Sequence, residues 1–255
     1  MKRIKAQVLR EFGDHGADTL ERYFVQIEYT AFWCIRMLRH AEGIEAVIPE
    51  GVEDAVIVRL GINELHQIKT RDESQGPWTN AEVLPILCQQ YQRRNAFLGQ
   101  CHFHFVSNQM ADAKTSLGPR SLGPLYPLKH LLEIKHDGQA YKVEEQQELQ
   151  RFEGIFVPRI RDGLVKDYHD NIDDATALEL LHNTWIETDS SRLRNADNIT
   201  ELDSAFRELY PDLPAYTLSE LSEIYDRLVL LVFVRAQDIA NSFISKKAQD
   251  IANSL

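Results

Sequence analysis

The sequence lacks a hydrophobic run long enough to cross a membrane. Its longest apolar stretch, LVLLVFV at 228–234, is far shorter than the roughly 20 residues that a membrane-spanning helix needs. The first residues, MKRIKAQVLREF, contain no apolar core of a secretory signal. We therefore expect a cytoplasmic protein that makes no contact with a membrane.

Cysteine is also scarce, and no cofactor motif accompanies it. The three cysteines, Cys34, Cys88 and Cys101, have no paired spacing, and the scattered histidines complete no zinc signature. We interpret the three as reduced, structural thiols. No GxxxxGK phosphate loop occurs, so the sequence gives no sign of ATP control within the chain.

Positive charge is in deficit, with 28 Lys and Arg against 39 Asp and Glu and a formal net charge of −11. Proteins that bind nucleic acid by bulk electrostatics carry clustered basic residues. Any contact with DNA must therefore be local, and most basic residues are ordinary solvated charges. The candidate basic patches are Lys69 with Arg71, Arg93 with Arg94, Lys114 with Arg120, and Arg159 with Arg161.

With 255 residues, 44% of them hydrophobic, the chain can bury a sizeable core, as one large domain or one with a small appendage. Apolar residues at steps of three and four predict an amphipathic helix over 18–41. Segments rich in β-branched residues predict strands at 44–48, 54–60, 63–69 and 101–107. Thr79 and Glu82 form a capping box that opens a helix running to about Leu98.

The second half of the chain is mainly helical by pattern. Residues 108–127 contain Ser-Leu-Gly-Pro twice, at 116–119 and 121–124, and predict a long surface loop. Helical patterns follow at 143–152, 173–186, 199–209 and 219–243. The segment AQDIANS occurs at 236–242 and again at 248–254, and we have no physical account of this duplication.

Polar residues gather at one end of the second predicted hairpin. A type II′ turn at Gly61-Ile62 would pair Leu60 with Asn63, and counting outward then sets Asp54 opposite Lys69. Asp54, Gln67 and Lys69 would share one side of the sheet, because side chains alternate with period two.

That trio has a chemical use in phosphate chemistry. The carboxylate of Asp54 and the amide oxygen of Gln67 are hard ligands suited to Mg²⁺ or Mn²⁺. Lys69 would orient or deprotonate water and hold a phosphate. A second acid is expected, and Glu28 on the first helix, or Glu50 or Glu53 ahead of the strand, could supply it. The alternative is an incidental surface ion pair between Asp54 and Lys69.

Other conspicuous residues have structural interpretations. His102 and His104 alternate on a strand and find no partner at ligand spacing in the sequence, which favours satisfied histidines over metal ligands. Trp78, ahead of a helix, more often packs as a hydrophobic staple than stacks on a base. Ser107 and Asn108 could contact a phosphate or make a turn.

The residues from Tyr23 to Leu87 resemble the N-terminal endonuclease domain of bacterial anti-phage effectors, among them the DNA-cleaving effectors of CBASS systems. The shared pattern is a glutamine in the first helix, an Asp preceded by acids at a strand start, a Gln-x-Lys strand, and a Trp-Thr helix opening. The resemblance spans roughly residues 16–108 and implies a PD-(D/E)XK nuclease in which Gln67 replaces the usual acid. It matches Gln26 to the helix glutamine and Glu50 to the acid ahead of Asp54.

The resemblance implies an α/β fold with a restriction-endonuclease-like core, a mixed central sheet flanked by helices, and a mainly helical C-terminal part. We expect the nuclease core at 1–165 and a helical extension at 166–255. The expected activity is Mg²⁺- or Mn²⁺-dependent cleavage of double-stranded DNA in anti-phage defence. Activation would come from a partner, a ligand or oligomerisation, in a homo-oligomer or with other defence-complex subunits. DNA contacts are expected at Thr70, Arg71, Arg93 and Arg94.

Two rivals remain from the sequence. A catalytically inactive subunit could keep the fold and dock on DNA or serve assembly. A purely structural or interaction protein could recruit a partner through its acidic helical half. Loss of metal-dependent cleavage in Lys69→Ala or Asp54→Ala would separate the nuclease from both.

Overall fold

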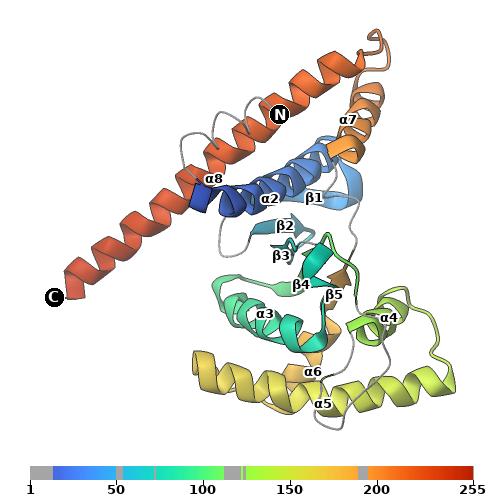
Figure 1. Cartoon of the computed structure of the whole chain (residues 1–255), viewed down its shortest axis with the longest axis vertical. Coiled ribbons are helices and arrows are strands. Elements are labelled where there is room, and N and C mark those ends of the chain that lie inside the picture. Colours follow the sequence, from blue (N-terminus) through green and yellow to red (C-terminus); the bar gives the residue numbers. More distant parts are fainter. Residues whose placement is uncertain are drawn as a thin grey trace. The chain divides into compact units, whose positions relative to one another are not determined.

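The computed structural model describes residues 14–49, 54–71, 73–111, 122, 125–188 and 195–254. The chain forms two compact units, one of residues 1–60 with 191–255 and one of residues 61–190 (Figure 1). The strands pair antiparallel in the first unit and parallel in the second, and each unit also contains helices. The predicted α/β class with mixed strand pairing and flanking helices is therefore confirmed.

The first unit is built around a long helix that is buried on several sides. It contains α2 (Asp14–Leu38), β1 (Ile44–Pro49), β2 (Ala55–Arg59), α7 (Asn195–Leu209) and α8 (Leu218–Ser254). Ile27, Ala31 and Ile35 of α2 are at most 1% exposed and join one apolar cluster with α7 and α8. The predicted amphipathic helix is confirmed, and its stripe faces other helices.

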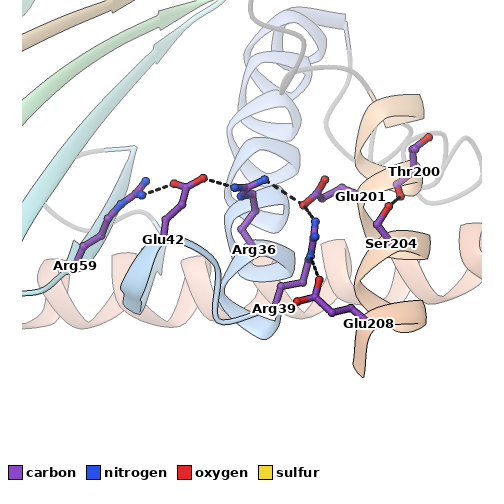
Figure 2. Close-up of polar contacts among 8 residues, drawn as sticks. All are labelled: Arg36, Arg39, Glu42, Arg59, Thr200, Glu201, Ser204 and Glu208. Atoms are coloured by element: carbon purple, nitrogen blue, oxygen red, sulfur yellow. Dashed lines mark hydrogen bonds and ion pairs between the residues drawn. The ribbon is translucent and has the colours of Figure 1, made fainter. Parts of the chain in front are cut away.

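A chain of ion pairs links α2 to both of its flanks (Figure 2). In order, it runs through Arg59, Glu42, Arg36, Glu201, Arg39 and Glu208. Glu201 of α7 lies 3.2 Å from Arg36 and 2.5 Å from Arg39, and its side chain is 19% exposed. Because one carboxylate serves two guanidinium groups in a partly desolvated place, the network fixes α7 against α2 more firmly than exposed pairs would.

The second unit contains three parallel strands in the order β3-β4-β5. Its elements are β3 (Ile62–Lys69), α3 (Asn80–Arg93), β4 (Gln100–Ser107), α4 (Leu125–His136), α5 (Val143–Tyr168), α6 (Asp174–His182) and β5 (Thr184–Glu187). Leu65, Phe103, Phe105 and Ile186 point from one face of the strands into the main apolar cluster, with residues of α3, α5 and α6. This face is buried in the apolar core, and the opposite face carries polar and aromatic side chains.

Two elements of the second unit differ from the sequence prediction. The segment Asn183-Thr184-Trp185-Ile186, predicted as the end of a helix, turns into β5, which pairs with β4. Helix α4 begins at Leu125, within the stretch predicted as a loop, and Leu125 and Leu128 are buried. The repeated Ser-Leu-Gly-Pro segment lies outside the described residues apart from Leu122. Helix α3 ends at Arg93, and a 3-10 turn continues to Ala96.

The turn between β2 and β3 lies one residue earlier than predicted. Leu60 and Gly61 both have positive φ, 44° and 82°, the combination of a type I′ turn. The predicted turn at Gly61-Ile62 is therefore wrong, because Ile62 already belongs to β3. The opposition of Asp54 and Lys69, counted from that turn, loses its basis.

The cysteines agree with their interpretation as structural thiols. All three are free. Burial raises the pKa of Cys34 to about 11 and that of Cys88 to about 12. Neither is therefore a thiolate near neutral pH. Among the described residues, no helix has the length and apolar content to span a bilayer.

Candidate active site

Gln67 and Lys69 occupy the carboxyl end of β3 in the second unit. In the parallel register Gln67 pairs with Phe105 of β4 and Lys69 with Ser107. Strand alternation puts both side chains on the same face as Leu65, the face that carries the apolar core. Gln67 is 3% exposed and Lys69 is half-buried, so the carboxamide lies where water is largely excluded and the lysine lies at the margin of that region.

Trp78 and Ser107 form a buried hydrogen bond at the end of β4, the strand beside Gln67 and Lys69. Ser107 is fully buried, and its hydroxyl accepts a hydrogen bond from the indole nitrogen of Trp78 at 2.6 Å. The Trp78 ring packs edge-on against Phe105, with ring centroids 5.2 Å apart. Trp78 is 8% exposed, so it packs as predicted and offers no free face to a base.

Asn108 fastens the segment after β3. Its amide accepts a hydrogen bond from the Arg71 backbone N–H at 3.0 Å and donates one to the Arg71 carbonyl at 3.2 Å. This reciprocal pair supports the turn interpretation of Ser107-Asn108, because the polar atoms of both side chains are bound within the chain.

Arg71, predicted to contact DNA, is held by its own unit. Its guanidinium lies 3.7 Å from the Trp78 ring centre and pairs with Glu82 at 2.7 Å. It also donates to the carbonyls of Gly76 and Pro77. Bonding to Arg71 holds the pKa of Glu82 below its usual range. Arg71 thus organises the start of α3, and Thr70, half-buried after β3, is its neighbour in the chain.

Arg93 and Arg94 lie at the other end of the strands from Lys69. Arg94 donates to the Tyr91 carbonyl at 2.6 Å and pairs with Asp170 at 2.7 Å. It lines a cleft with Gln100, where β4 begins, whereas Lys69 pairs with Ser107, where β4 ends. Seven strand steps separate those ends by roughly 23 Å. The structure therefore does not gather the four predicted DNA-contacting residues into one patch.

The predicted acids belong to the first unit. Asp54 directly precedes β2 and is half-buried. Glu28 on α2 is 4% exposed, and its negative charge adds to the effect of burial in raising the pKa of Tyr225 on α8. Gln26 is half-buried, and its carbonyl accepts a hydrogen bond from Thr30. Glu50 and Glu53 lie outside the described residues.

Sequence reasoning missed two features of this region. The sequence predicts only a capping role for Glu82, yet this residue also forms an ion pair with Arg71. His104 was interpreted as lacking a partner at ligand spacing, yet β3 brings His66 beside it, with ring centroids 4.2 Å apart. The pattern Glu64-x-His66 on one predicted strand and His102-x-His104 on another was the available signal.

A family model described as "Cap4, dsDNA endonuclease domain" matches residues 14–230. None of the curated protein sequences compared matches at a significant level.

Solved structures of a SAVED/CARF-domain containing receptor, Cap4 of Acinetobacter baumannii, are similar to the chain at 11% identity. The structure with the cyclic trinucleotide 3′3′3′-cAAA gives a TM-score of 0.49, covering 83% of this chain and 42% of that one. A second structure of the receptor gives 0.48 with the same coverage. The structure with 2′3′3′-cAAA gives 0.48, covering 89% and 45%. The chain thus spans less than half the length of these receptors.

Proposed function

Since this chain belongs to the Cap4 dsDNA endonuclease domain family, we propose that it hydrolyses phosphodiester bonds in double-stranded DNA with the help of a divalent metal ion. The observation that carries the proposal is the placement of Gln67 and Lys69. A nearly buried carboxamide and a half-buried ammonium share one face at the carboxyl end of β3. An amide oxygen and an ammonium at one strand end are the kinds of group that bind a divalent ion and a phosphate, so their shared position favours a functional role.

The donor set fits a hard cation. The proposed ligands are the carboxylate of Asp54 and the amide oxygen of Gln67, both oxygen donors of the kind that Mg²⁺ and Mn²⁺ prefer. Glu28 or Glu50 would add the second acid. Glu28 is 4% exposed, and a buried carboxylate is stabilised by a cation. When bound, the ion would stabilise negative charge that develops on the phosphate.

Lys69 would act on the phosphate and on water. Lys69 ends β3 opposite Ser107 and is half-buried, and partial burial strengthens the attraction of its ammonium for a phosphate oxygen. In its neutral form the same nitrogen could accept a proton from the attacking water. Gln67, two residues earlier, would orient that water or the metal through its amide oxygen.

We further propose that cleavage serves anti-phage defence and awaits activation by a ligand, a partner or self-association. Uncontrolled cleavage of DNA would harm the cell that makes the enzyme, and association can supply basic surface that a chain of net charge −11 lacks. The rival function, an inactive DNA-docking or assembly subunit, predicts DNA binding without cleavage.

The test is digestion of supercoiled and linear plasmid with Mg²⁺, with Mn²⁺, and with a chelator. We expect nicks and breaks only with metal, and none from Asp54→Ala at matched folded content. Asp212→Ala, which removes an exposed acid of the same unit, is the control and should cut as the original does. Metal-independent cleavage, or full activity in Asp54→Ala, would contradict the proposed centre.

If the purified protein cleaves no plasmid, a second measurement is needed, in which Mn²⁺ is titrated into the protein and binding is measured by calorimetry. Binding that Asp54→Ala abolishes and Asp212→Ala preserves would support a nuclease held inactive. DNA binding with no metal binding would instead support the docking subunit.

A further inference from the structure

Three metal-ligating side chains converge on the strand face opposite to Gln67 and Lys69. Glu64 and His66 come from β3, and His104 comes from β4. Each offers one ligand atom, and these atoms all lie within 4.8 Å of one another. Since strand residues alternate between faces, this cluster lies on the face opposite to the proposed ligand Gln67, although both belong to β3.

The spacing is close to that of a metal site. His66 Nε2 lies 3.6 Å from Glu64 Oε2. Two ligands of a tetrahedral Zn²⁺ lie about 3.3 Å apart, given Zn–N and Zn–O bonds of about 2.0–2.1 Å. The His66 and His104 residues are partners in the parallel register, and their rings stack with an interplanar angle of 16°. Binding of one ion by all three would draw these ligand atoms, which lie within 4.8 Å of one another, closer together.

The side chains of the cluster are largely buried. His66 is 1% exposed, His104 is 8% exposed, and the Glu64 side chain is 12% exposed. The two histidine rings lie with centroids 4.2 Å apart, so both imidazoles face the same small volume. Imidazole binds metals in its neutral form.

His104 is oriented as a metal ligand is. Its Nδ1 lies 3.0 Å from Glu187 Oε1 of β5, so the ring hydrogen bonds to a carboxylate on one side. Its other nitrogen, Nε2, is buried and makes no hydrogen bond to any described residue. A carboxylate that holds one imidazole nitrogen so that the other faces a metal is the usual second-sphere arrangement at zinc sites.

We propose that Glu64, His66 and His104 bind Zn²⁺, with Glu187 positioning His104. Two imidazole nitrogens and one carboxylate suit Zn²⁺ and exclude Mg²⁺ and Ca²⁺, which take oxygen ligands. The fourth position would take water. The ion would fasten β3 to β4 from behind the catalytic face, and this assignment holds whether or not the chain cleaves DNA.

The test is titration of the purified chain with Zn²⁺ by calorimetry, with Mg²⁺ in excess to occupy oxygen sites. We expect one Zn²⁺ per chain. Co²⁺, as a spectroscopic probe, should give the intense visible absorption of a tetrahedral ion. His66→Asn should abolish binding, and Glu187→Gln should weaken it about 10–100-fold.

The matched control is His182→Gln. His182 also pairs with a glutamate, Glu153, at 2.7 Å in the same unit, but this pair is not part of a three-ligand cluster among the described residues. The His182→Gln variant should leave Zn²⁺ affinity unchanged. If the original chain binds no Zn²⁺ at a one-to-one ratio, the proposal is overturned. It is also overturned if His182→Gln loses as much Zn²⁺ affinity as Glu187→Gln. If His66→Asn fails to fold, the comparison of Zn²⁺ affinity between Glu187→Gln and His182→Gln still tests the proposed site.

Discussion

The hydrogen bond between Trp78 and Ser107 ties the end of β4 to the segment that precedes α3, because both groups are buried. Ser107→Ala would leave the indole N–H without its acceptor in a place that water does not reach. We expect a loss of about 1–3 kcal/mol in the free energy of unfolding. Urea denaturation followed by fluorescence measures it.

Ser204→Ala is the control for this residue. The Ser204 hydroxyl donates to the Thr200 carbonyl in an exposed part of α7, so its loss should change stability by less than about 0.5 kcal/mol. Equal effects of the two substitutions would show that the Trp78–Ser107 bond contributes nothing beyond helix or strand propensity.

At the level of the elements, Glu82 makes the start of α3 sensitive to acid. Its carboxylate pairs with Arg71 and accepts hydrogen bonds from the hydroxyl and backbone N–H of Thr79, and these contacts hold its pKa below its usual range. A lowered carboxyl pKa stabilises the fold above the unfolded value, and that stability is lost as pH falls through the folded value. Glu82→Gln should therefore lose less melting temperature than the original protein between neutral pH and about pH 3. Equal losses would contradict this coupling.

The turn between β2 and β3 is strained at Leu60. Its φ of 44° is costly for leucine, and its side chain is 78% exposed, so little packing offsets the cost. Asn-Gly is the preferred pair for a type I′ turn. Leu60→Asn should raise the free energy of unfolding by about 0.5–1 kcal/mol. Leu98→Asn, at a 96% exposed leucine, should have little effect, and a loss of stability in Leu60→Asn would contradict the strain argument.

Elements with a clear periodicity were predictable from sequence, and elements set by tertiary contacts were not. The first helix and four strands carry a strong 3.6- or 2-residue pattern, and the structure contains them. Residues 184–187 read as the continuation of helix 173–186, yet they form β5 because Thr184 and Ile186 bury against β4 and the core. Local pattern cannot reveal such a pairing, since the partner strand lies some 80 residues away.

The candidate site was predictable only in part for a similar reason. Gln67 and Lys69 follow from a strand pattern, and the structure places both at one strand end. The cluster of Glu64, His66 and His104 depends on the parallel register of β3 with β4, which no single segment encodes. A type II′ turn puts glycine first, whereas the positive φ of Leu60 puts Gly61 second in a type I′ turn, which the sequence pattern does not reveal.

On the scale of the whole molecule, the net charge of −11 limits how the chain binds DNA. Of the four residues predicted to contact DNA, Arg71 and Arg94 form ion pairs with Glu82 and Asp170. With about three phosphate contacts, a fourfold rise in salt should weaken DNA binding about 40-fold. Fluorescence anisotropy with a labelled duplex in chelator measures this slope. A fall of 10³-fold or more, typical of about 6–10 contacts, would contradict a local interface.

The most direct test of the nuclease assignment is plasmid cleavage by Lys69→Ala beside Lys129→Ala. Lys129 of α4 is a partly buried lysine of the same unit, paired with Glu133 and outside the proposed site. Both variants should fold, as judged by circular dichroism and melting temperature. The account predicts that Lys69→Ala loses at least about 100-fold in cleavage rate with Mg²⁺ or Mn²⁺, while Lys129→Ala keeps the original rate. Undiminished cleavage by a folded Lys69→Ala would contradict it.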